Sequence, residues 1–154
     1  MSNIYPVVSE VIPYRGASNG EKSYVMVQEK DSGLWNQPGG GIDVSDKEWQ
    51  SAAVREVHEE SGLTIVLNGV IGNYSFPSKN GNRILCSTFS GEYVSGSLET
   101  KTEDIMDVKA MTLEEIRYLN SKDMLRSGRS NIKPIEDLLR RGTYEMGEIF
   151  QFLG

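Results

Sequence analysis

The alternation of apolar and polar residues along the chain predicts several strands, with helices between and after them. A short extended piece over 34–41 breaks at Pro38 and at three consecutive glycines. Five further segments are rich in apolar and β-branched residues, which is typical of strands: 4–14, 23–29, 64–76, 83–94 and 104–111. The pattern therefore predicts more strands than helices.

Three segments have the spacing and end signals of helices. The first begins at Ser45 or Asp46, either of which can cap free backbone N–H groups, and ends at Gly62. The second is 112–120, which opens with a capping box. The third is 131–142, with an apolar stripe and a terminal glycine. With strands in the majority, we expect an α/β sandwich, a mixed sheet with helices on its faces, in a single domain over 1–154.

Composition narrows the class of protein. A net charge of −6 argues against a broad nucleic-acid or membrane-surface binding face. No stretch approaches 18 uninterrupted apolar residues, and the N-terminus lacks the pattern of a signal peptide, so we expect a soluble, cytoplasmic protein. Cys86 is the only cysteine, which excludes an internal disulfide and a Cys-rich zinc site, and we interpret it as a buried strand residue.

The first predicted helix carries an unusual set of carboxylates. Glu56, Glu59 and Glu60 are three and four residues apart, so their side chains converge on one helix face. Like charges at this spacing weaken a helix by about 0.2–0.5 kcal/mol per pair, which suggests that a cation sits among them. Arg55 reaches Glu59 one turn later and can orient it, and the small residues 52–53 leave room for an ion.

Clustered carboxylates favour Mg²⁺ or Mn²⁺ over zinc. The glycines directly before the helix allow a backbone carbonyl to approach such an ion, because no Cβ stands in the way. A solvated acidic helix face is the alternative, since acidic helices are common. The combination of glycine loop, spaced carboxylates, arginine and terminal glycine favours the metal site.

Residues 39–63 resemble the Nudix box, G-x5-E-x7-R-E-U-x-E-E-x-G-U, in which U is aliphatic. Its second half is matched in full by Arg55, Glu56, Val57, Glu59, Glu60, Gly62 and Leu63. The first half departs from the pattern. Counting back from Arg55 places Lys47 where the family has a glutamate, and Asp46 and Glu48 are the other candidates for that place. The segments around the box resemble small bacterial Nudix phosphatases of nucleotides and thiamine-pathway pyrophosphates.

The resemblance implies an enzyme that hydrolyses a nucleoside diphosphate linked to another group, with Mg²⁺ or Mn²⁺ as cofactor. Glu59 and Glu60 would be metal ligands, and Glu56 a ligand or the base that orients water. The carbonyl of Gly39 or Gly40 would complete the metal's protein ligands. Arg55 and Glu59 join Glu56 as the catalytic set, and a further acid from outside the box would be Glu103 or Asp104, unless these are solvated loop acids.

Substrate contacts are less determined by the sequence. Arg15 and Arg83 could bind a phosphate, and Tyr74 and Phe76 could stack on a base, although strand aromatics are more often core residues and exposed arginines are common. We expect a small nucleotide or pyrophosphate as the partner, with a homodimer as a further option for the apolar tail 149–153, which could equally pack on its own sheet.

Three other functions compete with a nucleotide pyrophosphohydrolase. Pro77 lies close to where Nudix ADP-ribose hydrolases carry a proline, which keeps an ADP-ribose-type hydrolase open. A Nudix module that senses a nucleotide without hydrolysing it is another class, but such modules usually lose box carboxylates. A Nudix-type isoprenyl diphosphate isomerase has little support in a short chain with one cysteine.

Overall fold

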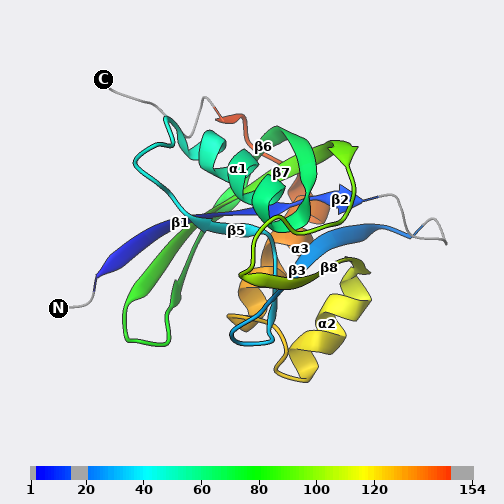
Figure 1. Cartoon of the computed structure of the whole chain (residues 1–154). Helices are drawn as coiled ribbons and strands as arrows, with labels where there is room; N and C mark the ends of the chain where they lie inside the picture. The colour runs from blue at the N-terminus through cyan, green and yellow to red at the C-terminus, as the bar shows by residue number, and fades with distance from the viewer. Residues whose placement is uncertain (1–2, 15–20, 147–154) are drawn as a thin grey trace.

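The computed structural model describes residues 3–14 and 21–146, and these form two four-stranded sheets covered by helices (Figure 1). The first sheet has the order β5-β1-β7-β6. Its strands are β1 (Ile4–Val11), β5 (Gly39–Gly41), β6 (Leu63–Pro77) and β7 (Arg83–Gly96). Strand β1 runs parallel to β7, whereas β5 and β6 are antiparallel to their neighbours. The prediction of a mixed sheet is therefore confirmed.

The second sheet is antiparallel and is built around β3 (Ser23–Glu29). This strand pairs with β2 (Pro13–Tyr14), β4 (Trp35–Asn36) and β8 (Ile105–Thr112). The predicted single strand over 4–14 is thus two strands in different sheets. The break is at Ile12, whose carbonyl accepts a hydrogen bond from the N–H of Val25 at 3.1 Å. The chain therefore passes from the first sheet to the second at this residue.

Helix α1 (Trp49–Ser61) carries the clustered glutamates and starts later than the sequence predicted. Glu48 is its N-terminal cap residue and makes no side-chain capping hydrogen bond, so the prediction of a start at Ser45 or Asp46 is wrong. Asp46 does not cap the helix because its carboxylate is occupied by Arg55 and by the N–H of Asp43. The predicted end at Gly62 is confirmed, with φ of 79°, a conformation that glycine adopts without a Cβ penalty.

The remaining helices are α2 (Leu113–Ser121), the short 3-10 helix η1 (Gly128–Asn131) and α3 (Lys133–Arg141). The predicted capping box of α2 is confirmed: Thr112 accepts from the N–H of Glu115, whose side chain accepts from the N–H of Thr112. Helix α3 contributes Ile135 to a core that also contains Met26 of β3 and Ile71 of β6. This core therefore holds α3 and both sheets together.

Helix α1 packs against the first sheet through small residues. Ala52 and Ala53 are fully buried in a cluster with Val8, Val70 and Phe89. The expectation that these alanines leave room for an ion is wrong, because their small side chains instead let the helix approach the sheet closely. Because of this close approach, the next turn of the helix, which carries the carboxylates, lies close to β1 and β5.

Three further points bear on the sequence predictions. Cys86 is buried on β7, as expected. None of the described helices is both long and apolar enough to cross a membrane. Arg15 and the tail 149–153 lie outside the described residues.

Candidate active site

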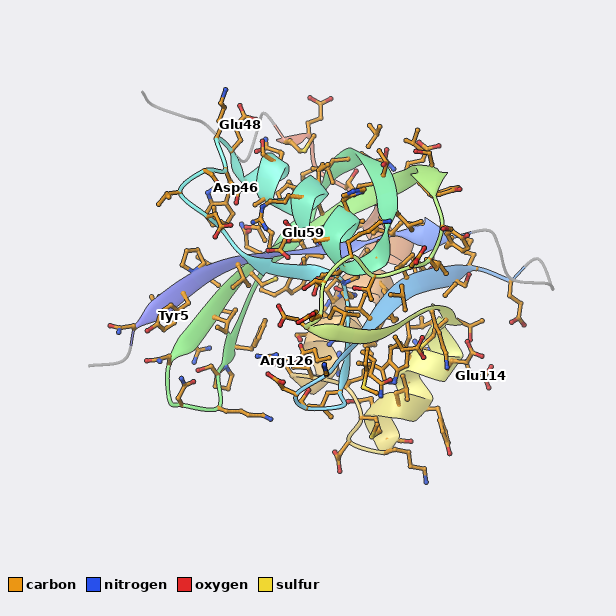
Figure 2. All side chains as sticks on the ribbon, in the orientation of Figure 1. Tyr5, Asp46, Glu48, Glu59, Glu114 and Arg126 are labelled. Atoms are coloured by element: carbon orange, nitrogen blue, oxygen red, sulfur yellow. The ribbon has the colours of Figure 1, made fainter. Side chains whose placement is uncertain are left out.

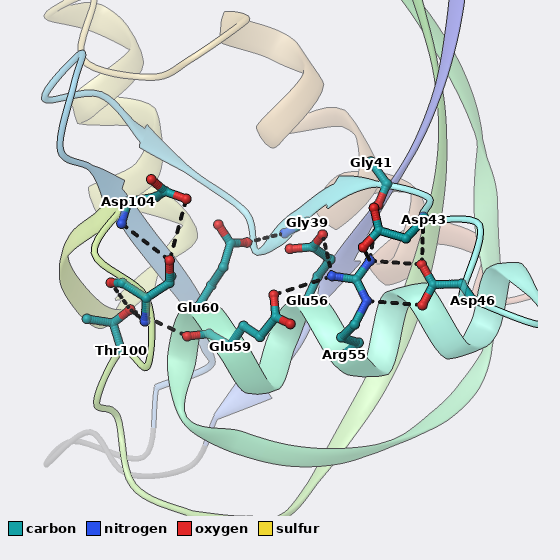
Figure 3. Close-up of polar contacts among 11 residues, drawn as sticks. Gly39, Gly41, Asp43, Asp46, Arg55, Glu56, Glu59, Glu60, Thr100 and Asp104 are labelled. Atoms are coloured by element: carbon teal, nitrogen blue, oxygen red, sulfur yellow. Dashed lines mark hydrogen bonds and ion pairs between the residues drawn. The ribbon is translucent and has the colours of Figure 1, made fainter.

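The glycine strand β5 and helix α1 meet through two glutamates (Figure 3). The N–H of Gly39 donates a hydrogen bond of 2.7 Å to Glu60 Oε1. At Gly40, a Cβ would lie 2.6 Å from Glu56 Oε1, a distance that real side chains do not tolerate. The absence of a side chain at Gly40 is thus what lets the Glu56 carboxylate lie against the strand.

Arg55 links the other carboxylates of the site. Its NH1 donates to Glu56 Oε1 at 3.1 Å and to Glu59 Oε2 at 3.3 Å. Its Nε and NH2 donate to the two oxygens of Asp46 at 3.0 and 2.9 Å, which is a bidentate ion pair. The hydrogen bond to Asp46 is the main reason that the pKa of Arg55 is raised, so the guanidinium stays charged while it holds three carboxylates.

Burial changes the acidity of the two glutamates that face β5. It raises the pKa of Glu60 to about 8, although the hydrogen bond from the Gly39 N–H acts in the opposite direction. The pKa of Glu56 is also raised, again by burial first, and the nearby Arg55 opposes that shift. Without a cation, the folded chain therefore favours protons on these carboxylates, and a bound cation would favour their ionised forms.

Glu10 is a buried acid beside this site that sequence reasoning missed. The residue is 0 % exposed, and neither of its carboxylate oxygens has a hydrogen-bond partner among the described residues. Burial is the main reason that its pKa lies well above the usual value, and Glu60 is the nearby charge that adds most to the shift. The sequence did hold a signal. Glu10 lies two residues from Val8 and two from Ile12 in an apolar strand segment, and this spacing places all three on the inward face.

A cavity of about 570 Å³ opens next to the glycine strand. Tyr74 and Phe76, the two aromatic residues considered as substrate contacts, both line it, while the hydroxyl of Tyr74 donates to Asp137 Oδ2 at 2.8 Å. Arg83 does not line it and donates to Ser75 Oγ instead. The other lining residues include the following polar and small groups: Ser9, Gly39, Gly40, Lys79, Thr88, Arg126, Ser127 and Ser130.

A second cavity, of about 420 Å³, contains Glu60 and the candidate acid Asp104, but not Glu103. Figure 3 shows Asp104 on the opposite side of Glu60 from Arg55. Both cavities share Arg126 and Lys79, and Arg126 NH1 donates to Glu29 Oε2 at 2.5 Å. Sequence reasoning missed Arg126, which follows α2 in an irregular segment with no periodic signal.

Comparison with known proteins identifies the family of this chain. The family model described as NUDIX domain matches residues 12–134, which is most of the chain. The chain belongs to the Nudix family. A solved structure, a NUDIX hydrolase from Nitrosomonas europaea, has the same fold, with a TM-score of 0.80, 26% identity and coverage of 97% of each chain.

Two curated Nudix relatives match shorter segments. A Bacillus subtilis (strain 168) protein named "Putative 8-oxo-dGTP diphosphatase" is 39% identical over 59 residues, which are 38% of this chain and 39% of the relative. An RNA pyrophosphohydrolase from Erythrobacter litoralis (strain HTCC2594) is 39% identical over 51 residues, or 33% of this chain and 30% of the relative. The matches thus span less than two-fifths of each relative's length.

The residues of the Nudix box differ in their contacts and in their exposure. Of the three residues that could replace the first-half glutamate, Asp46 is the one bonded to Arg55, whereas Lys47 and Glu48 are exposed. Glu59 lies on the outer side of α1, with 47% of its side chain exposed (Figures 2 and 3). His58, on the same helix, is exposed.

The donor set of the site suits a hard cation, although its side chains are not in ligating positions. In the described part of the chain, no three Asp, Glu, His or Cys side chains are grouped to hold a metal ion. Glu56 and Glu59 accept hydrogen bonds from Arg55, and Glu60 accepts one from the N–H of Gly39. Carboxylate and backbone oxygens are nonetheless the ligands of Mg²⁺, and the two buried oxygens of Glu10 beside them have no hydrogen-bond partner among the described residues.

Proposed function

We propose that this chain is a Mg²⁺- or Mn²⁺-dependent Nudix pyrophosphohydrolase that cleaves a phosphoanhydride bond in a nucleoside di- or triphosphate or a related small pyrophosphate. One observation carries the proposal: Glu56 and Glu60 lie against Gly39–Gly40, and these glycines form a wall of the 570 Å³ cavity. Carboxylates and glycine carbonyls that could bind a metal thus lie next to a cavity of the size that small ligands occupy.

The cavity offers groups for both parts of such a substrate. Lys79 and Arg126 line it and could bind phosphate oxygens, and the half-buried ring of Phe76 could stack on a base. The hydroxyls of Ser9 and Thr88 lie on the same wall as the glycines and are bonded to each other at 2.8 Å. Phosphates placed by Lys79 and Arg126 would therefore face the carboxylates of α1.

In the proposed reaction, Glu59 and Glu60, with a Gly39 or Gly40 carbonyl, would hold the cation. When bound, a divalent cation neutralises phosphate charge and lowers the pKa of an attacking water. Glu56 accepts the proton of that water at Oε2, the oxygen that Arg55 NH1 does not contact. The water oxygen forms a bond to phosphorus, the bridging oxygen leaves, and Arg55 keeps Glu56 oriented through the step.

A second candidate is an ADP-ribose-type hydrolase, which Pro77 favours because this residue lines the same cavity beside Phe76. The names of the two curated relatives point to different substrates, an oxidised nucleotide and an RNA, so they support the shared chemistry more than any one compound.

The test is release of phosphate, pyrophosphate or monophosphate from a panel of nucleoside di- and triphosphates, 8-oxo-dGTP, ADP-ribose and thiamine-pathway pyrophosphates. Each compound is assayed with Mg²⁺, with Mn²⁺ and with chelator. We expect metal-dependent turnover that falls about 100-fold or more in Glu59→Gln. Turnover that persists in chelator would refute the metal-dependent mechanism, and binding of a nucleotide without turnover would favour a sensing module.

A further inference from the structure

Glu10 is a carboxylate in a place where the fold gives it no partner. The side chain is fully buried on β1, and both Oε atoms lack a hydrogen bond within residues 3–14 and 21–146. Its backbone N–H does have a partner, because it donates a hydrogen bond to the carbonyl of Pro38 at 3.0 Å. The unpaired groups are therefore the two carboxylate oxygens themselves.

The position of Glu10 on β1 aims its side chain at α1. Residues two apart on a strand face the same side, and Val8 packs against Ala52 and Ala53 of the helix. Glu10 follows on that side, and the charged side chains that act on it are Glu60, Glu56 and Arg55. Glu10 thus lies under the helix turn whose glutamates contact β5.

An apolar residue would be the ordinary choice at this position. The flanking residues on the same face, Val8 and Ile12, are both buried in apolar clusters. A buried carboxylate without hydrogen bonds is costly, and other carboxylates nearby increase the cost. A cation bound beside Glu60 would give the carboxylate of Glu10 the partner that the described residues do not provide.

We propose that Glu10 is a further ligand of the divalent cation, supplied by the first strand from outside the Nudix box. The proposal rests on the metal-dependent function proposed above. It assigns the ligands to three elements: Glu10 from β1, a glycine carbonyl from β5, and the glutamates of α1. A shell of carboxylate and carbonyl oxygens from these elements suits Mg²⁺ or Mn²⁺.

The test compares Mn²⁺ binding and thermal unfolding of the full chain in wild type and Glu10→Gln. Glutamine keeps the size of glutamate but removes the charge. Without metal, we expect Glu10→Gln to unfold at the same or a higher temperature than wild type, because a repelled acid is gone. With Mn²⁺, we expect its Kd by calorimetry to rise about 10-fold or more and its metal-induced rise in Tm to shrink.

Glu114→Gln is the matched control, since it removes one negative charge from an exposed site on α2, far from Asp46 and Glu48 at the start of α1 (Figure 2). Its Mn²⁺ affinity should equal that of wild type. Equal affinity in Glu10→Gln would overturn the assignment of Glu10 while leaving the proposed function intact. Absence of Mn²⁺ binding in wild type would overturn both.

A crystal structure of wild type with Mn²⁺ gives an answer that does not depend on the folding of any variant. The anomalous signal of the ion would locate it. A Glu10 oxygen in direct coordination is the expected result, and an ion whose shell excludes Glu10 would refute the inference.

Discussion

Asp46 and Arg55 form a two-bond ion pair that closes the loop between β5 and α1. Arg55 Nε and NH2 donate to the two carboxylate oxygens, and 5% of the Asp46 side chain is exposed. The hydrogen bond from Arg55 is the main reason that the pKa of Asp46 is lowered. Because the same guanidinium contacts Glu56 and Glu59, this pair orients the carboxylates that we propose bind metal and water.

Replacing Asp46 should therefore impair the site through Arg55. We expect Asp46→Asn to lower kcat or metal affinity by about 10–100-fold, the usual effect of losing a residue that orients metal ligands. Lys47→Ala and Glu48→Ala change its exposed neighbours and should stay close to wild type in the same assay. A larger loss in either of these would assign the supporting role to that residue and remove it from Asp46.

The glycines of β5 provide a second test, because adjacent positions differ sharply in the space around them. A Cβ at Gly40 would lie 2.6 Å from Glu56 Oε1, whereas one at Gly41 would meet no atom within 4 Å. We expect Gly40→Ala to displace Glu56 and to weaken Mn²⁺ binding and turnover by about 10-fold or more. Gly41→Ala should leave both nearly unchanged, and equal loss in the two variants would mean that strand flexibility matters more than the contact.

The raised pKa of Glu60 predicts a pH dependence of stability in the absence of metal. Because its pKa is about 8 in the folded state against an ordinary value of 4.5, the folded chain binds this proton more tightly than the unfolded chain. The resulting stability is complete below about pH 4.5 and is lost as pH rises through about 8. The loss amounts to at most roughly 5 kcal/mol.

Denaturant unfolding in chelator at pH 5 and pH 8.5 measures this effect. Glu60→Gln should lose less free energy of unfolding between the two pH values than wild type does, since glutamine does not ionise. Glu114→Gln, which changes an exposed glutamate, should follow wild type. If Glu60→Gln and wild type lose the same free energy, Glu60 ionises normally in the folded chain.

Arg126 is expected to act on the substrate. It lines both cavities and is paired with Glu29, and we predict that Arg126→Gln raises KM about 10-fold with a smaller change in kcat, because a phosphate contact is lost. Arg83→Gln is the control, since Arg83 bonds to Ser75 and lines neither cavity. The reverse pattern, with KM changed only by Arg83→Gln, would assign the phosphate contact to Arg83, one of the two arginines that the sequence analysis considered.

Local patterns in the sequence determined much of the fold and the centre of the site. The strands, the capping box at Thr112 and the helix end at Gly62 depend on residues close together in the chain, so they could be predicted. The same is true of Glu56, Glu59 and Glu60, whose convergence follows from helical spacing. The predicted helix start failed because Asp46 bonds to Arg55, nine residues away, and not to the helix N–H groups.

The tertiary structure alone decided which distant residues join that centre. Glu10 reaches the site because β1 passes under α1, and Arg126 reaches it because the chain returns beside β4 after α2, where its N–H donates to the carbonyl of Trp35. Neither residue lies within a motif, and each is separated from the Nudix box by whole strands or helices. By itself, the sequence determined a carboxylate helix that follows three glycines, since local spacing dictates that convergence. The glycines, predicted as a loop, form strand β5 because they pair with β1. Which acids and cations surround them depended on strand pairing and core packing, which act between segments far apart in the chain.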